Sequence, residues 1–262
     1  MSFLPAPLDV RPTAPLARVT GVTRLVAGAL WLILAAALPS ARAEAVLAVA
    51  AVVVLLLWSG IPLAPLPRRL APLALGACGL GVTAALGNAA NRDPAQAILL
   101  VVGPLPLTDA GLAAGVALGL RVAVIGLVSV LVFAPADLTR LADALVQQAH
   151  VPDRLAFGSV AALGLAPRTA ADWVATGAAR RLRGRSPRTP VGRLVAVPGR
   201  LLVVLVMALR RGERLALAMD ARGFDSGRPR SRFRPVAAGM LDVVVLAGAV
   251  VVAAAAVRVQ WG

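Results

Sequence analysis

Apolar stretches alternate with short polar or basic segments along most of the chain, and this pattern predicts several membrane-spanning helices. A helix needs about 20 apolar residues to cross a hydrocarbon core of roughly 30 Å. The segments that approach or meet this length are 22–38, 45–64, 71–90, 110–134 and 236–257. A further apolar segment, 97–108, is interrupted by Gly103, Pro104 and Pro106, so we expect it to be re-entrant or interfacial. The expected fold class is an all-α integral membrane protein with about five transmembrane helices.

The polar region between residues 135 and 234 carries repeated helix signals. Leu138, Leu141 and Leu145 recur at i, i+3 and i+7 and mark one face of an amphipathic helix. Two longer helices are expected after it, over about 153–184 and about 191–223. Prolines and a glycine interrupt these two helices, and we regard them as possible hinges: Pro167, Pro198 and Gly199.

Positive charge is concentrated in the same region. The chain has a formal net charge of +15, and residues 135–234 hold 18 arginines against 7 acidic residues. The positive-inside rule places this region in the cytoplasm, and five crossings then leave the N-terminus inside and the C-terminus outside. We therefore expect a multi-pass protein of the cell membrane in three parts: 1–134 with four spanning helices, 135–234 as a cytoplasmic region of amphipathic helices, and 235–262 with the last spanning helix.

Residue counts exclude several chemistries. Every basic side chain is Arg, and a chain without Lys has no P-loop lysine, so we do not expect it to hydrolyse ATP by that route. His150 is the single histidine and Cys78 the single cysteine. A histidine-based metal site, a catalytic triad and an intrachain disulfide are thereby excluded. No catalytic or metal-binding residue is assigned.

Arg121 lies inside the fourth predicted spanning helix. Because a charged side chain is costly inside a membrane, we expect it to have a structural or functional role. One interpretation is a buried structural pair with Asp109 or Asp242. The other is a role in motion or in partner contact. The spanning segments carry no chain of acidic residues, which argues against a proton relay.

Two helices of the basic region end in the same dipeptide, Arg183-Gly184 and Arg222-Gly223. A structural reading is sufficient for one such end, because Arg in a last turn compensates the helix dipole and glycine closes the helix in the αL conformation. The repetition favours a paired docking device that presents guanidinium groups to carboxylates on two similar surfaces. On the second helix Arg211 precedes Arg222 by eleven residues, which places them within about 20° of one face and about 16.5 Å apart.

The surrounding motifs resemble those of the transmembrane T component of energy-coupling factor (ECF) transporters, a family that includes cobalt- and biotin-type permease subunits. The family's two Arg-Gly motifs and intervening proline are matched by 179–184, Pro198 and 210–224. Family-like phrases also occur at 15–26 and 135–145, so the resemblance covers nearly the whole chain. Arg180 departs from the family pattern, which often has Gln there.

The resemblance implies a non-catalytic coupling subunit of an ABC importer for a vitamin or a metal ion. Its expected partners are two ABC ATPase subunits, a membrane-embedded substrate-binding S component and the lipid bilayer, with no nucleic acid. The chain itself would bind no cofactor, since ATP and Mg would be used by the ATPases. The resemblance assigns ATPase coupling to Arg183, Gly184, Ala218, Met219, Asp220, Ala221, Arg222 and Gly223. Secondary coupling candidates are Ala179, Arg180 and Arg211.

Two other classes of protein remain open. A conventional ABC permease with its own substrate path would need polar groups along its spanning helices, which here are rich in Ala, Leu, Val and Gly. A membrane-anchored scaffold with a basic lipid- or nucleic-acid-binding region would use charge alone. It would give Arg183 and Arg222 no advantage over Arg228 and Arg230.

Overall fold

The computed structural model describes residues 14–62, 66–93, 98–102, 105–134, 137–184, 189–224 and 234–261. Arg228 and Arg230 of the basic run, and Gly103 and Pro104 of the interrupted apolar segment, lie outside these ranges. The described residues form two compact units. The first unit contains those up to Ala149 and those from Val236 onward, and the second contains His150 to Pro235.

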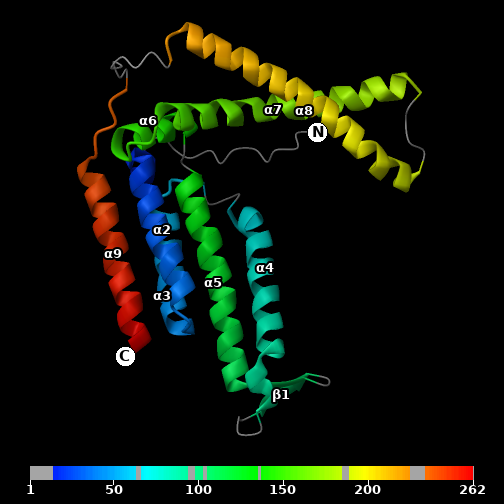
Figure 1. The fold of residues 1–262 in the computed structure, drawn as a ribbon. Coiled ribbons are helices and arrows are strands. Elements are labelled where there is room, and N and C mark those ends of the chain that lie inside the picture. Colours follow the sequence, from blue (N-terminus) through cyan, green and yellow to red (C-terminus); the bar gives the residue numbers. More distant parts are fainter. Residues whose placement is uncertain are drawn as a thin grey trace. The chain divides into compact units, whose positions relative to one another are not determined.

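The first unit is built from long helices that lie side by side in Figure 1. Their bounds are α2 Gly21–Ala37, α3 Ala41–Leu57, α4 Leu66–Gly87, α5 Asp109–Phe133 and α9 Met240–Trp261, with the short α1 Pro15–Arg18 before them. Each of the five long helices overlaps one of the apolar segments that the sequence pattern predicts. The all-α membrane class is therefore confirmed.

Length divides these helices into two groups. Among the described residues, the helices long and apolar enough to cross a bilayer are in α4, α5, α8 and α9. Both α2 and α3 have 17 residues, which at 1.5 Å per residue gives about 25 Å. The helices long enough to cross a bilayer include α8 Pro190–Ala221, which lies in the region predicted to be cytoplasmic. Its first half is apolar on all sides.

Hydroxyl side chains cap the starts of three helices of the first unit. Thr20 accepts the amide N–H of Thr23 at the start of α2, and Ser40 accepts that of Ala43 at the start of α3. The hydroxyl of Thr108 does the same for α5 by accepting the N–H of Gly111. Such caps satisfy amide groups that a helix leaves free in its first turn. They set the register in which each helix presents its side chains.

Small residues allow α4 and α5 to pack with their backbones close together. A Cβ at Gly115 would stand 2.6 Å from the carbonyl oxygen of Gly81, and one at Gly81 would stand 2.9 Å from that of Gly115. Ala85 and Gly119 continue this contact along the two helices. In a lipid solvent, close van der Waals contact of this kind replaces the hydrophobic effect as the main force between helices.

The interrupted segment forms a hairpin. Strand β1 Ile98–Val102 pairs antiparallel with β2 Leu105–Thr108. The side chain of Asn91, in the 3-10 turn η1 Ala89–Arg92, accepts from both the amide and the hydroxyl of Thr108 at 3.0 and 2.8 Å. The described residues of this segment thus form strands, a structure that the sequence pattern did not predict. Whether the hairpin enters the membrane stays a prediction.

The amphipathic helix α6 Leu138–Gln148 packs within the first unit, although the sequence division places it in the cytoplasmic region. Leu141 lies over Gly21 of α2, where a Cβ would come within 2.5 Å of its Cδ1. Gln147 accepts the amide N–H of Val236 at 2.9 Å. Leu141 therefore covers the N-terminal end of α2, whereas Leu138 of the same face is exposed.

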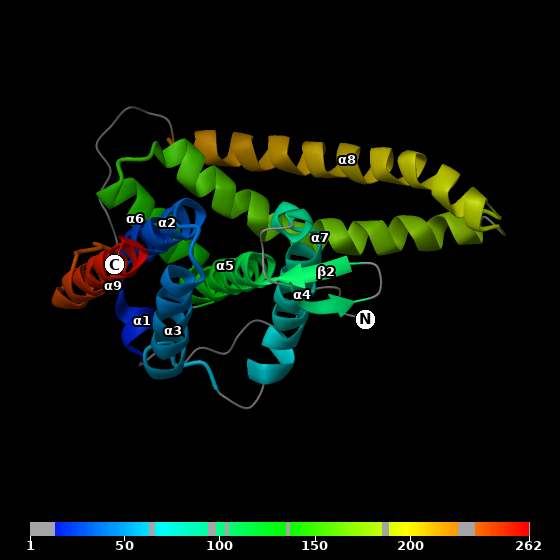
Figure 2. The same cartoon turned by 90° about the horizontal axis from the view of Figure 1, so that it is seen from below.

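The second unit is an antiparallel pair of long helices, α7 Asp153–Leu182 and α8, which run alongside each other in Figure 2. Both agree with the expected helices, and both continue through their internal prolines, Pro167 and Pro198. The face of α8 turned away from α7 is apolar and exposed, as Leu194, Val195 and Leu202 show.

We predict that Gly115→Val destabilises the first unit, because a side chain at this position has no room between α4 and α5. Overpacking of this kind costs about 1–3 kcal/mol. Gly79→Val is a matched control, since nothing lies within 4 Å of a Cβ placed on Gly79. Thermal unfolding in detergent should give a lower Tm for Gly115→Val and an almost unchanged Tm for the control. Equal Tm values for the two variants would contradict the close packing.

Candidate functional site

Both Arg-Gly dipeptides close their helices with the same backbone geometry. Gly184 has φ +70° after α7, and Gly223 has φ +71° after α8. At the end of α8 the N–H of Gly223 donates to the carbonyl of Asp220, and the N–H of Phe224 donates to that of Met219. This is a Schellman motif, in which only glycine adopts the αL position without strain. The predicted αL cap at Gly223 is confirmed.

The two Arg-Gly ends lie at opposite ends of the helix pair. The ring of Phe224, just past α8, meets the ring of Phe157 near the start of α7 edge to face, with centroids 6.3 Å apart. Arg183 stands at the other end of α7, which has 30 residues and is therefore about 45 Å long. Because the helices are antiparallel, the pair carries the same motif at its two opposite ends (Figure 2).

Side chains at both ends are accessible. Arg183, Gly184, Ala218, Asp220, Ala221 and Arg222 are exposed, whereas Met219 and Gly223 are partly buried. Within the part of the chain that the structure describes, the guanidinium groups of Arg183 and Arg222 have no hydrogen bond or ion pair. Each end therefore offers a cation beside a glycine that lets another surface approach closely.

The secondary candidates Arg180 and Arg211 instead face the neighbouring helix. Arg180 donates from Nη1 to the carbonyl oxygen of Ala196 at 2.9 Å. Arg211 forms an ion pair with Asp172, with 2.9 Å between Nη1 and Oδ2. Arg211 therefore holds α8 to α7. Arg211 and Arg222 were expected to lie on one face of α8, but only Arg222 is exposed. The remaining candidate, Ala179, is exposed.

Sequence reasoning missed a third arginine between the helices. Arg200 donates to the carbonyl oxygen of Trp173, and its Cζ lies 4.0 Å from the centre of the Trp173 ring. Glycines make room for these side chains: a Cβ on Gly177 would stand 2.5 Å from Arg200, and one on Gly199 would stand 2.9 Å from Arg180. The sequence signal for these contacts was the position of the two glycines. Gly177 lies three residues before Arg180, and Gly199 lies directly before Arg200.

The three possible hinges occupy different surroundings. Pro167 and Pro198 lie inside continuous helices with exposed side chains. Gly199 provides the space that Arg180 occupies. Bending at any of them stays a prediction.

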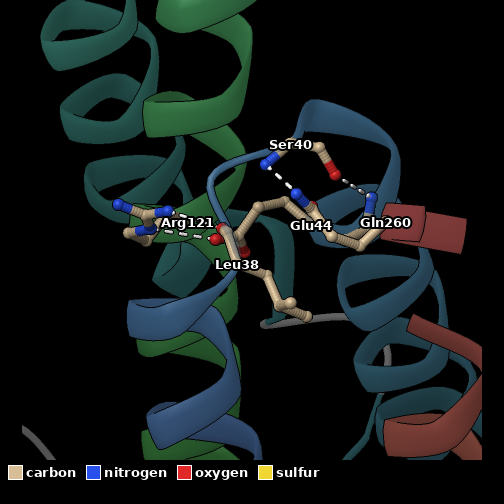
Figure 3. Close-up of polar contacts among 6 residues, drawn as sticks. Leu38, Ser40, Glu44, Arg121 and Gln260 are labelled. Atoms are coloured by element: carbon tan, nitrogen blue, oxygen red, sulfur yellow. Dashed lines mark hydrogen bonds and ion pairs between the residues drawn. The ribbon is translucent and has the colours of Figure 1, made fainter. Parts of the chain in front are cut away.

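Arg121 forms a partly buried ion pair, but with a different partner from those expected. Its Nε lies 2.9 Å from Oε1 of Glu44, and its Nη2 donates to the carbonyl oxygen of Leu38 at 2.7 Å (Figure 3). The prediction of Asp109 or Asp242 is wrong. Glu44 looked like a loop residue, but the Ser40 cap starts α3 at Ala41 and brings Glu44 into its first turn, where it is fully buried.

The described His, Cys, Asp and Glu side chains form no group of three that would hold a metal ion. The site therefore consists of arginine cations, glycine caps and apolar helix faces.

The fold and this site define a multi-pass helical membrane protein with two repeated arginine-bearing helix ends. Residues 14–233 match the family model described as CbiQ, cobalt transport protein. This match spans most of the chain and both Arg-Gly ends, so the chain belongs to the CbiQ family of cobalt transport proteins, the T components of ECF transporters. No curated protein matches the chain. The chain is thus a membrane component of a transporter of this class.

We predict that Arg121→Ala strongly destabilises the first unit, because the Glu44 carboxylate would remain buried without its cation. Removing one partner of a buried ion pair costs about 3–5 kcal/mol. Arg121→Met combined with Glu44→Leu removes both charges and should cost less than the single change. Unfolding in increasing denaturant measures both variants. A double variant at least as unstable as Arg121→Ala would contradict the ion pair.

Proposed function

We propose that the chain is the coupling subunit of an ECF-type importer. In this role it links two cytoplasmic ATPases to a membrane-embedded S component that binds the substrate, a vitamin or a metal ion. The observation that carries the proposal is the repetition of one motif, an exposed arginine followed by an αL glycine, at the two ends of a single helix pair.

Each end has the chemistry of a docking point for an acidic groove. The exposed guanidinium of Arg183 or Arg222 would donate charge-assisted hydrogen bonds to carboxylates of one ATPase. The glycine beside it lacks a side chain, so the partner's backbone can come close. Ala218, Met219, Asp220 and Ala221 of the last turn of α8 would complete the second contact.

The spacing of the ends suits two separate partners. Helices of this length put the motifs about 40 Å apart, which is too far for one shallow groove. The internal contacts of Arg180, Arg200 and Arg211 hold α7 against α8. A change in the distance between two ATPases would therefore bend the pair, with Pro167, Pro198 and Gly199 as hinges. ATP and Mg²⁺ would be used by the ATPases, and this chain would bind neither.

The exposed apolar face of α8 supports a contact on the membrane side. Leu194, Val195, Leu201 and Leu202 are more than half exposed, and a contiguous apolar surface of this kind marks a protein or membrane contact. We assign it to the S component or the bilayer, with the Arg-rich region cytoplasmic and the C-terminus outside.

The experiment is substrate uptake in cells that express the complete transporter with Arg183→Glu or Arg222→Glu. Loss of a desolvated charge-assisted contact costs about 2–5 kcal/mol, so each change should reduce uptake by about tenfold or more. Arg193→Glu is the matched control, because Arg193 is an exposed cation in the first turn of α8 without a glycine cap. It should leave uptake nearly unchanged, since exposed ion pairs contribute about 0–1 kcal/mol.

Co-purification of the ATPases at matched expression separates the alternatives. Equal losses from all three variants would favour nonspecific electrostatics, as in a basic membrane scaffold. Normal uptake by both Arg183→Glu and Arg222→Glu would contradict the proposal.

A further inference from the structure

A cavity of about 260 Å³ lies among α2, α3, α5 and α9 of the first unit. Its lining is almost entirely apolar and includes Trp31 and Trp58 as well as Val128 and Leu131. Arg24 is the one charged residue among the described side chains that line it. The cavity therefore combines a hydrocarbon-like interior with a single cation.

Arg24 is buried and lacks a full set of partners. The residue is only 7% exposed, and its Nε and Nη1 atoms have no hydrogen-bond acceptor within the described part of the chain. The nearby carboxylate of Asp242 already accepts the amide N–H groups of Thr20 and Gly239, at 2.8 and 2.7 Å. A buried guanidinium with free donors is unfavourable unless an anion binds it. Asp242 therefore supplies a neighbouring negative charge, but Nε and Nη1 of Arg24 still lack an acceptor.

The polar and apolar parts of the cavity lie at different depths along the helices. Arg24 is in the first turn of α2, whereas Trp31 lies two turns further on, about 10 Å along the axis. Trp58 follows the last residue of α3, and Leu131 is in the last turn of α5. The cation therefore stands at the ends of the helices, and the apolar part extends toward their middle. This polarity matches an amphiphile with an anionic head and a hydrocarbon tail.

We propose that this cavity binds one acyl chain of an anionic phospholipid from the bilayer, with the lipid phosphate held by Arg24. The volume is slightly below the roughly 300–1,000 Å³ of typical small-molecule sites, so it accommodates a chain rather than a whole lipid. The aliphatic lining offers nothing to a polar solute. Exposed Val244 and Gly248 on α9 form the opening through which the chain enters from the surrounding lipid. The site is independent of the proposed ATPase contacts.

The two cavity tryptophans provide a direct reporter. The chain has four tryptophans, so Trp173 and Trp261 are replaced by Phe to leave Trp31 and Trp58. The full-length protein is reconstituted in phosphatidylcholine vesicles that contain either brominated phosphatidylglycerol or brominated phosphatidylcholine at equal mole fraction. Bromine quenches a nearby indole. Phosphatidylglycerol should quench more strongly, because its net negative charge selects it for the Arg24 site.

Two variants test the charge and the space separately. Arg24→Gln should abolish the difference between the two lipids, while Arg18→Gln, an exposed cation at the same end of the unit, should retain it. Gly248→Leu should reduce quenching by both lipids, because Gly248 lines the cavity and a large side chain at this position would narrow it, while nothing within 4 Å of its Cβ would clash. Gly79→Leu on α4 is the control with the same free space away from the cavity. Gly248→Leu keeps Arg24 and so remains informative if Arg24→Gln does not fold.

Equal quenching by the two lipids in the parent protein would overturn the proposal, because it would identify only nonspecific contact with the bilayer. Loss of the phosphatidylglycerol preference on addition of inorganic phosphate would also overturn it, and would assign the site to free phosphate. An unchanged preference in Arg24→Gln together with unchanged quenching in Gly248→Leu would exclude this cavity as the lipid site.

Discussion

The arrangement of both Arg-Gly ends depends on the arginines that join α7 to α8. Arg180, Arg200 and Arg211 reach across from one helix to acceptors on the other, and Asp172 neutralises the last of them. An apolar interface would hold the helices equally well, but α8 already exposes apolar residues on its other face. The hydrogen bonds and the ion pair of these arginines determine which face of α8 packs against α7. They thereby determine which arginine is exposed at each end of the pair.

In the first unit, charged side chains are buried among apolar helices. There the solvent is hydrocarbon, so close packing of small residues and complete pairing of polar groups hold the helices together. Arg121 and Glu44 follow this rule in part, because Oε1 of Glu44 is paired with Arg121 while Oε2 has no hydrogen-bond partner among the described residues. Arg24 departs from the rule further, since two of its nitrogens are buried without an acceptor and the residue lines a cavity. A departure from this rule marks the place where a ligand from the bilayer would complete the structure.

Local signals made much of this fold predictable. The apolar segments predicted the long helices of the first unit, and the Arg-Gly dipeptides predicted the αL cap at Gly223 because helix ends depend on few neighbouring residues. Contacts between distant segments were not predictable in the same way. The partner of Arg121 depends on Ser40 starting α3 early enough to bury Glu44. The inward direction of Arg211 depends on α7 presenting Asp172, which no pattern within α8 reveals.

The central claim is that the two ends of one helix pair contact two different ATPase subunits. A photo-cross-linking amino acid placed at both Leu182 and Leu217, which are 90% and 69% exposed, tests it in the assembled transporter. After illumination and denaturation, the account predicts a product that contains one copy of this chain and two ATPase subunits. A product with a single ATPase, formed from both positions, would show that the two ends share one partner and would contradict the account.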